Sequence, residues 1–136
     1  MCPFINANFL VIAVAVVASF FFGFLWYGPI FGKQWAELVG LKIREGECNK
    51  PKPWALPLTL LGTILTTFVL AYFLSIYKPF CAFGAAFFIW AGFYLPVLFS
   101  SVSWEGKSWK LLLLNASFYF LNLQLIAAIL SFKNAF

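Results

Sequence analysis

The sequence predicts an all-α membrane protein, with four transmembrane helices in an antiparallel bundle. Of its 136 residues, 64% are hydrophobic and 10% are charged. Average usage is about half apolar and about a quarter charged, and a soluble domain this small cannot bury so much apolar surface. Four charge-free stretches are each long enough to cross the bilayer, which takes roughly 20 helical residues. Helices satisfy their own backbone polar groups in lipid, and no alternating pattern indicates a β-barrel.

The predicted spans cover residues 9–30, 54–77, 80–102 and 111–132, within a single transmembrane domain over residues 1–136. The first stretch has no basic residue before Lys33 and is too long for the apolar region of a signal peptide, so we expect it to be retained. It carries Ala15, Ser19 and Gly23 at four-residue spacing. Such a stripe lets another helix approach closely, either inside the bundle or across a homodimer face.

Gly28-Pro29 is the predicted exit of the first span, because proline lacks an N–H and clashes with the preceding helical turn. Trp26, Tyr27 and Trp35 flank this exit. Their amphipathic rings are typical of the headgroup region of a bilayer.

The interval 31–53 is the sizeable loop of the predicted fold. Trp35, Leu38 and Ile43 fall near helical spacing, with charged residues between them. This pattern predicts a short amphipathic helix lying in the membrane interface. Gly46 is its expected end.

Threonines mark one face of the second span, where Thr59, Thr63 and Thr66 recur at helical spacing. We expect this face to point at a neighbouring helix. The very short link at 77–79 predicts a tight antiparallel hairpin between the second and third spans. Pro96 interrupts the helical hydrogen bonding near the exit of the third span, where we expect a kink.

Polar residues of the second and fourth spans form a candidate intramembrane cluster: Asn115, Tyr119, Asn122, Thr63 and Thr66. The three residues of the fourth span share one helical face. An amide without a partner in hydrocarbon costs roughly several kcal/mol, so we expect partners from the threonine face and from Ser19. The cluster serves either interhelical hydrogen bonding or the binding of a polar substrate.

Basic residues concentrate in the loops after the first and third spans: Lys33, Lys42, Arg44, Lys50, Lys52, Lys107 and Lys110. The opposite side carries Lys78 and Lys133. The positive-inside rule therefore predicts that loops 31–53 and 103–110 are cytoplasmic and that both termini lie outside. The net charge of +5 is explained by this topogenic role, without a nucleic-acid partner.

A candidate headgroup or partner patch gathers on the basic side: Lys33, Trp35, Trp104, Glu105, Lys107, Trp109 and Lys110. Lys and Trp are also ordinary depth anchors, which is the simpler interpretation. Residues 32–35 and 106–109 share the pattern Gly-Lys-x-Trp. Two repeated hairpins related by an axis along the membrane normal would produce this pattern, and so would coincidence.

The sequence lacks His and Asp, and its acidic residues are Glu37, Glu45, Glu47 and Glu105. This excludes a Ser-His-Asp triad, a Cys–His pair, a His-ligated metal and an aspartyl dyad. Cys2, Cys48 and Cys81 show no metal-ligand spacing. We expect free thiols, with a Cys2–Cys81 disulfide as the alternative. We therefore expect no catalytic residue, metal or cofactor, and no enzyme.

Three segments carry a family resemblance. They are LWYGPIFGKQW at residues 25–35, WEGKSWKLLLLNA at residues 104–116 and WAGFYLP at residues 90–96. Together they resemble conserved blocks of the domain of unknown function 1761 (DUF1761) family. The resemblance implies a small four-span membrane protein, found largely in bacteria, with no known activity and no catalytic residue to carry over. Residues 99–101, Phe-Ser-Ser, are less polar than the family pattern.

Two functional hypotheses follow. The first is a non-enzymatic interaction, accessory or lipid-binding bundle that associates with membrane lipids, a partner membrane protein or a second copy of itself. The alternative is a small dimeric transporter or facilitator for a neutral or amphipathic solute. Proton-coupled export needs an ionisable group within the membrane, and none of the predicted spans carries one. The expected location is the bacterial plasma membrane.

Overall fold

The structure, a computed structural model, describes residues 9–40, 53–76 and 82–132, and its regular elements there are all helical. Four helices are long and apolar enough to cross a membrane: Phe9–Ile30, Ala55–Ile76, Ala82–Glu105 and Trp109–Ser131. They pack against one another, so the expected all-α, four-span fold is confirmed. The third span continues to Glu105, three residues beyond the predicted end at 102.

Each span is built from one or more helical elements. The first comprises α1 (Phe9–Leu25) and a π-helical turn, η2 (Trp26–Ile30), followed by the short helix α2 (Gly32–Val39). The second span is α3 (Ala55–Ile76). The third comprises α4 (Ala82–Ile89), the π-helical turn η4 (Trp90–Tyr94) and α5 (Leu95–Glu105), and the fourth is α6 (Trp109–Phe132).

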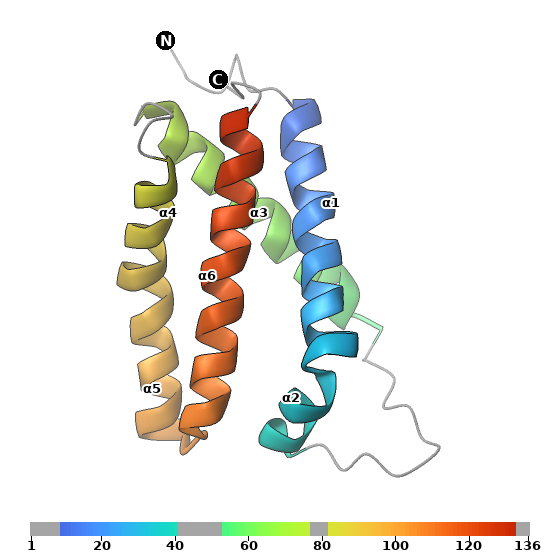
Figure 1. Cartoon of the computed structure of the whole chain (residues 1–136), viewed down its shortest axis with the longest axis vertical. Helices are drawn as coiled ribbons and strands as arrows, with labels where there is room; N and C mark the ends of the chain where they lie inside the picture. The colour runs from blue at the N-terminus through green and yellow to red at the C-terminus, as the bar shows by residue number, and fades with distance from the viewer. Residues whose placement is uncertain (1–8, 41–52, 77–81, 133–136) are drawn as a thin grey trace.

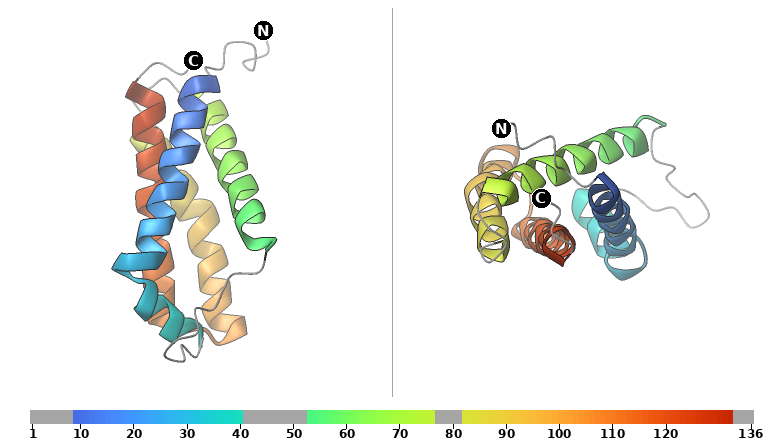
Figure 2. Two further views of the ribbon diagram at one scale, coloured as in Figure 1. Left: turned by 90° about the vertical axis from the view of Figure 1, so that its right-hand side faces the viewer. Right: turned by 90° about the horizontal axis from the view of Figure 1, so that it is seen from above.

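Helix α6 lies between α1 on one side and the α4–α5 span on the other, and α3 crosses this row obliquely (Figures 1 and 2). α1 begins and α6 ends at one end of the bundle, whereas α2 and the α5–α6 link lie at the opposite end (Figure 1). We call the latter the basic end, because the link carries Lys107 and α2 carries Lys33.

The hydrophobic core occupies the half of the bundle away from the basic end. Leu70 of α3 and Leu123 and Ile126 of α6 are almost fully buried there. Small residues allow the helices to approach closely at the same level: Ala15, Ala71, Ala82, Ala86 and Ala127. Helices in lipid have no hydrophobic driving force to associate, so the van der Waals packing that close approach permits holds them together.

The small-residue stripe of α1 packs inside this bundle. Ala15 is 0% exposed and Ser19 is 3% exposed within the single chain. A Cβ at Gly23 would come within 3.4 Å of the Phe118 ring of α6. Of the two roles considered for the stripe, intramolecular packing is therefore the one observed.

Helix α3 packs with only one of its halves. Thr67, Leu70, Ala71 and Leu74 are buried in the core. The part before them is largely exposed, and it diverges from the rest of the bundle toward its first residue, Ala55 (Figure 2, green). The divergence leaves space between α3 and its neighbours.

A π-helical turn accompanies the proline of the first span and the proline of the third span. Pro29 lies inside η2, where Phe31 N–H donates to the Trp26 carbonyl five residues earlier, at 2.9 Å. The helix thus ends at Ile30, the residue after Pro29. Pro96 follows η4 and sits in the first turn of α5, where its missing N–H costs little. In both spans a widened turn accommodates the missing donor.

Helix α2 ends earlier than expected. Gly40 adopts a left-handed conformation, with φ of 82°, and its N–H caps the carbonyl of Glu37 at 3.1 Å. The predicted end at Gly46 is therefore wrong for this helix. Its interfacial position, the repeated hairpins and the single-domain assignment stay predictions. The 77–79 turn and the three cysteines lie outside the described residues.

Candidate functional site: an uncharged polar cleft

A cavity of about 480 Å³ lies where α3 diverges from the bundle. Residues from all four spans line it: Ser19, Phe20, Gly23, Phe24, Tyr27, Leu56, Thr59, Gly62, Thr63, Thr66, Tyr94, Phe118, Tyr119 and Asn122. We call this cavity the α3 cleft. It contains four residues of the predicted polar cluster, since Thr63, Thr66, Tyr119 and Asn122 all line it.

Asn122 is held in the cleft by a hydrogen bond between two helices. The Ser19 hydroxyl of α1 donates to Oδ1 of Asn122 at 2.6 Å. Ser19 is thus the partner that the sequence predicted. The hydrogen bond engages the oxygen of the amide, and the Nδ2 group of this cleft-lining residue is a hydrogen-bond donor.

Asn115, the fifth predicted residue, does not line the cleft but binds Tyr27, which does. The Tyr27 hydroxyl donates to Oδ1 of Asn115 at 2.9 Å. The Tyr27 ring also packs edge-on against Phe118, with ring centroids 4.9 Å apart. These contacts position Tyr27 as a wall of the cleft.

The threonines of α3 do not bond to the amides of α6, contrary to expectation. The hydroxyls of Thr59 and Thr63 donate to carbonyls four residues earlier on their own helix, at 2.8 and 2.9 Å. This back-bonding is common for threonine in helices. Their oxygen atoms can still accept a hydrogen bond from a molecule in the cleft.

Two tyrosines close the side of the cleft formed by η4 and α6. The centroids of the Tyr94 and Tyr119 rings lie 4.8 Å apart. Tyr94 was not singled out from the sequence, because a lone tyrosine in an apolar span has no distinguishing pattern. Gly62 leaves the α3 wall open, since no heavy atom lies within 4 Å of a Cβ placed there.

The cleft combines many neutral polar groups with the absence of charge. Its described lining contains hydroxyls and one amide, and no acidic or basic residue. Transferring an ion into such a site is expensive, whereas a neutral hydroxyl or carbonyl can exchange its hydrogen bonds with water for bonds to the protein. The lining therefore suits an uncharged polar group.

A second cavity of about 430 Å³ lies farther along α3 and is almost wholly apolar. Leu65, Phe73 and Phe93 contribute to it, and Thr66 and Tyr94 line both cavities. A polar site thus adjoins an apolar one, with the two shared residues between them.

The predicted headgroup or partner patch is divided between two elements of the basic end. Lys33 and Trp35 lie on α2. The Trp35 ring packs against the Tyr27 ring, with ring centroids 5.6 Å apart. On the α5–α6 side, Trp104 is 88% and Trp109 is 65% exposed.

The charged members of the α5–α6 side have different surroundings. Glu105 and Lys107 form an ion pair of 2.6 Å. Lys110 lines a further cavity, shared with α2. The patch is therefore a set of residues at one end of the bundle, of which Lys110 belongs to a cavity.

The fold and the cleft define a class of protein: a four-span helical membrane protein with a neutral polar cavity under a divergent helix. A comparison with family models matches residues 10–131 to the protein of unknown function family DUF1761. The match covers most of the chain, so the protein belongs to the DUF1761 family. No curated protein and no solved structure shows a significant match.

Proposed function

We propose that this protein is a non-enzymatic lipid-binding bundle, which holds the uncharged polar group of an amphipathic molecule in the α3 cleft. The observation that carries the proposal is the composition of the cleft: Asn122, Tyr119 and Thr66 present polar groups in a cavity without charge. The cleft adjoins the apolar cavity beyond Thr66 and Tyr94, which fits a hydrocarbon tail. Polar groups convergent in a mostly apolar concavity are the usual design of a ligand site.

Location within the helices supports a neutral ligand. Asn122 lies near the middle of α6 and Ser19 within α1, so the polar groups reach membrane depth. A charged headgroup at that depth would be costly. A molecule such as a diacylglycerol, with one hydroxyl and two ester carbonyls, meets the chemistry of the cleft without that cost.

Steric filling of the cleft tests the proposal. Gly62→Leu places a side chain in open space within the cleft, and Gly84→Leu makes the same change on an exposed part of α4, where no atom lies within 4 Å of the new Cβ. Native mass spectrometry would measure retention of dioleoylglycerol by each purified variant. We expect Gly62→Leu to weaken retention by at least about tenfold and Gly84→Leu to leave it unchanged.

Two further variants keep the cavity shape and remove polar groups. Tyr119→Phe and Thr66→Val each delete the hydroxyl of a residue that lines the cleft. We expect each to reduce retention by a factor of about 2 to 10, as for a neutral hydrogen bond. Equal retention by the wild type, Gly62→Leu and Tyr119→Phe would contradict the proposal.

Facilitated passage of a neutral solute is the second candidate. It is favoured by the hydroxyl-lined wall that runs from Leu56 and Tyr27 near the basic end to Asn122. The buried core around Leu70 and Ile126 closes the bundle beyond this point, so passage would require a second conformation. Glycerol flux into proteoliposomes, absent in Gly62→Leu and present in Gly84→Leu, would support this function. The dimer assumed for it stays a prediction.

A further inference from the structure

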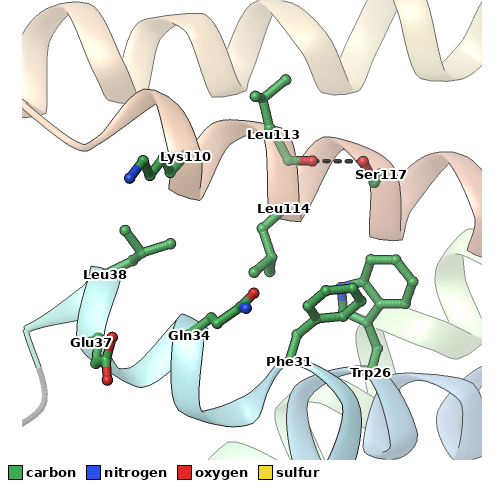
Figure 3. A pocket seen from close by; sticks show the side chains of 9 residues that line it. All are labelled: Trp26, Phe31, Gln34, Glu37, Leu38, Lys110, Leu113, Leu114 and Ser117. Atoms are coloured by element: carbon green, nitrogen blue, oxygen red, sulfur yellow. Dashed lines mark hydrogen bonds between the residues drawn. The ribbon is translucent and has the colours of Figure 1, made fainter.

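A cavity of about 540 Å³ lies between α2 and the first half of α6, at the basic end of the bundle. Figure 3 shows the side chains of Gln34 and Leu38 of α2 directed toward α6, with Gln34 facing Leu114. It is separate from the α3 cleft, and no described residue lines both. The sequence indicated Lys110 as part of a general patch, but not the pairing of α2 with α6.

The lining changes from charged to apolar along α6. Lys110 lies in the first turn of this span, Leu113 and Leu114 follow one turn deeper, and Ser117 lies a further turn away. Ser117 donates its hydroxyl to the Leu113 carbonyl at 2.7 Å, so it adds little polarity. Residues spaced by three and four positions share a helical face, which explains why these side chains line one cavity. The gradient matches a phospholipid, with its headgroup near Lys110 and a chain along the leucines.

Two exposed residues of opposite charge, one on each helix, line the cavity. Glu37 of α2 and Lys110 of α6 both line it. The ion pair found among the described residues joins Glu105 to Lys107 and involves neither Glu37 nor Lys110. Both groups are therefore available to a ligand that carries an anion and a cation.

Trp26 supplies an independent observation. Its Nε1 atom is buried and has no hydrogen-bond acceptor among the described residues, and its ring lines the cavity beside Phe31 (Figure 3). By contrast, Trp90 of the other π-helical turn donates to the Ala116 carbonyl at 2.9 Å. Leaving a buried donor unsatisfied is costly, so a ligand oxygen at this position would recover the loss.

We propose that the α2–α6 cavity binds one zwitterionic phospholipid with an ethanolamine headgroup. Lys110 contacts its phosphate, Glu37 accepts hydrogen bonds from its primary ammonium, and Trp26 donates to an ester oxygen. An acyl chain lies along Leu113 and Leu114. A primary ammonium donates up to three hydrogen bonds to a carboxylate, as lysine does, whereas a choline group has none to donate.

Lipid competition with the full chain tests the proposal. Native mass spectrometry would follow dioleoyl phosphatidylethanolamine, phosphatidylcholine and phosphatidylglycerol added in equal amounts. We expect the ethanolamine lipid to be retained about tenfold over the choline lipid, as for a charge-assisted hydrogen bond. Glu37→Gln should abolish this preference, and Lys110→Gln should weaken retention of all three lipids.

Matched variants separate the cavity from the general charge of the basic end. Lys107→Gln and Glu105→Gln change the exposed ion pair and should leave the lipid preference as in the wild type. Trp26→Phe keeps an aromatic ring and removes only the indole donor, so reduced retention without a fall in thermal stability would support the assignment. Gly62→Leu should block the α3 cleft and leave this site intact, so the two proposals can fail separately.

Three results would overturn the proposal. The first is equal retention of the three lipids by the wild type. The second is the same loss for Lys107→Gln as for Lys110→Gln, which would indicate a general effect of charge. The third is displacement of the lipid by millimolar inorganic phosphate, which would indicate a site for the free anion.

Discussion

The Ser19 hydroxyl donates a 2.6 Å hydrogen bond to the side-chain oxygen of Asn122, across 103 positions of the chain. It joins α1 to α6, and both residues line the α3 cleft. One polar contact thus serves two purposes, since it joins the two helices and fixes the side chain of Asn122, which lines the cleft.

The coupling between these two residues can be measured with a double-mutant cycle. Ser19→Ala and Asn122→Leu should each lower the free energy of unfolding, and the cycle should give a coupling of about 0.6–1.7 kcal/mol, the range of interhelical hydrogen bonds in membranes. Steric trapping in bicelles would supply the free energies. Ser117→Ala is the control, because its hydroxyl bonds only to its own helix. Strict additivity of Ser19→Ala and Asn122→Leu would contradict a direct bond.

The bond between Tyr27 and Asn115 makes a second stability prediction. Tyr27→Phe removes the hydroxyl but keeps the ring against Phe118 and Trp35. We expect a loss of about 0.5–1.5 kcal/mol and a similar loss for Asn115→Leu. The double variant should be little worse than either single variant, because each change removes the same bond. Thermal unfolding in detergent would check this, and an unchanged melting temperature for Asn115→Leu would contradict it.

Because α1 packs closely against its neighbours, we expect a larger side chain at Ala15 to destabilise the fold. This residue is fully buried, whereas the adjacent Val14 is 52% exposed. Ala15→Leu should destabilise the fold by about 1–3 kcal/mol through overpacking. Val14→Leu adds less volume on a face that lipid can cover, and should change stability little. If both variants unfold at the wild-type temperature, α1 does not pack through this face.

Much of the fold could be predicted, because hydrophobic length and missing charge determine where helices cross a membrane. The amide of Asn122 also had to find a partner, and the small stripe of α1 offered Ser19. The π-helical turns could not be predicted. Proline indicates that a hydrogen bond is lost, but whether the helix breaks or widens depends on the packing around Trp26 and Trp90.

The α3 cleft and the α2–α6 cavity depend on how helices cross, and this is why the sequence did not reveal them. The polar face of α6 and the threonine face of α3 were visible as periodic patterns. Their separation by a cleft, in place of direct hydrogen bonds, follows from the divergence of α3 away from the core around Leu70. Similarly, Gln34 and Lys110 are far apart in the sequence, and only the position of α2 brings them to one cavity.

The orientation of the bundle remains a prediction from the distribution of charge, and cysteine labelling can test it. In a chain with Cys2, Cys48 and Cys81 changed to Ser, Ser108→Cys places a thiol on the exposed α5–α6 link at the basic end. The positive-inside rule predicts that this thiol is cytoplasmic. A membrane-impermeant maleimide should therefore label it only after the cells are opened. A matched chain that keeps Cys2 and carries no Ser108→Cys should react in intact cells, since both termini are expected outside. The reverse pattern would place the basic end outside, against the charge bias. It would also put the α2–α6 cavity in the outer leaflet, so the lipid tests should then be repeated with the composition of that leaflet.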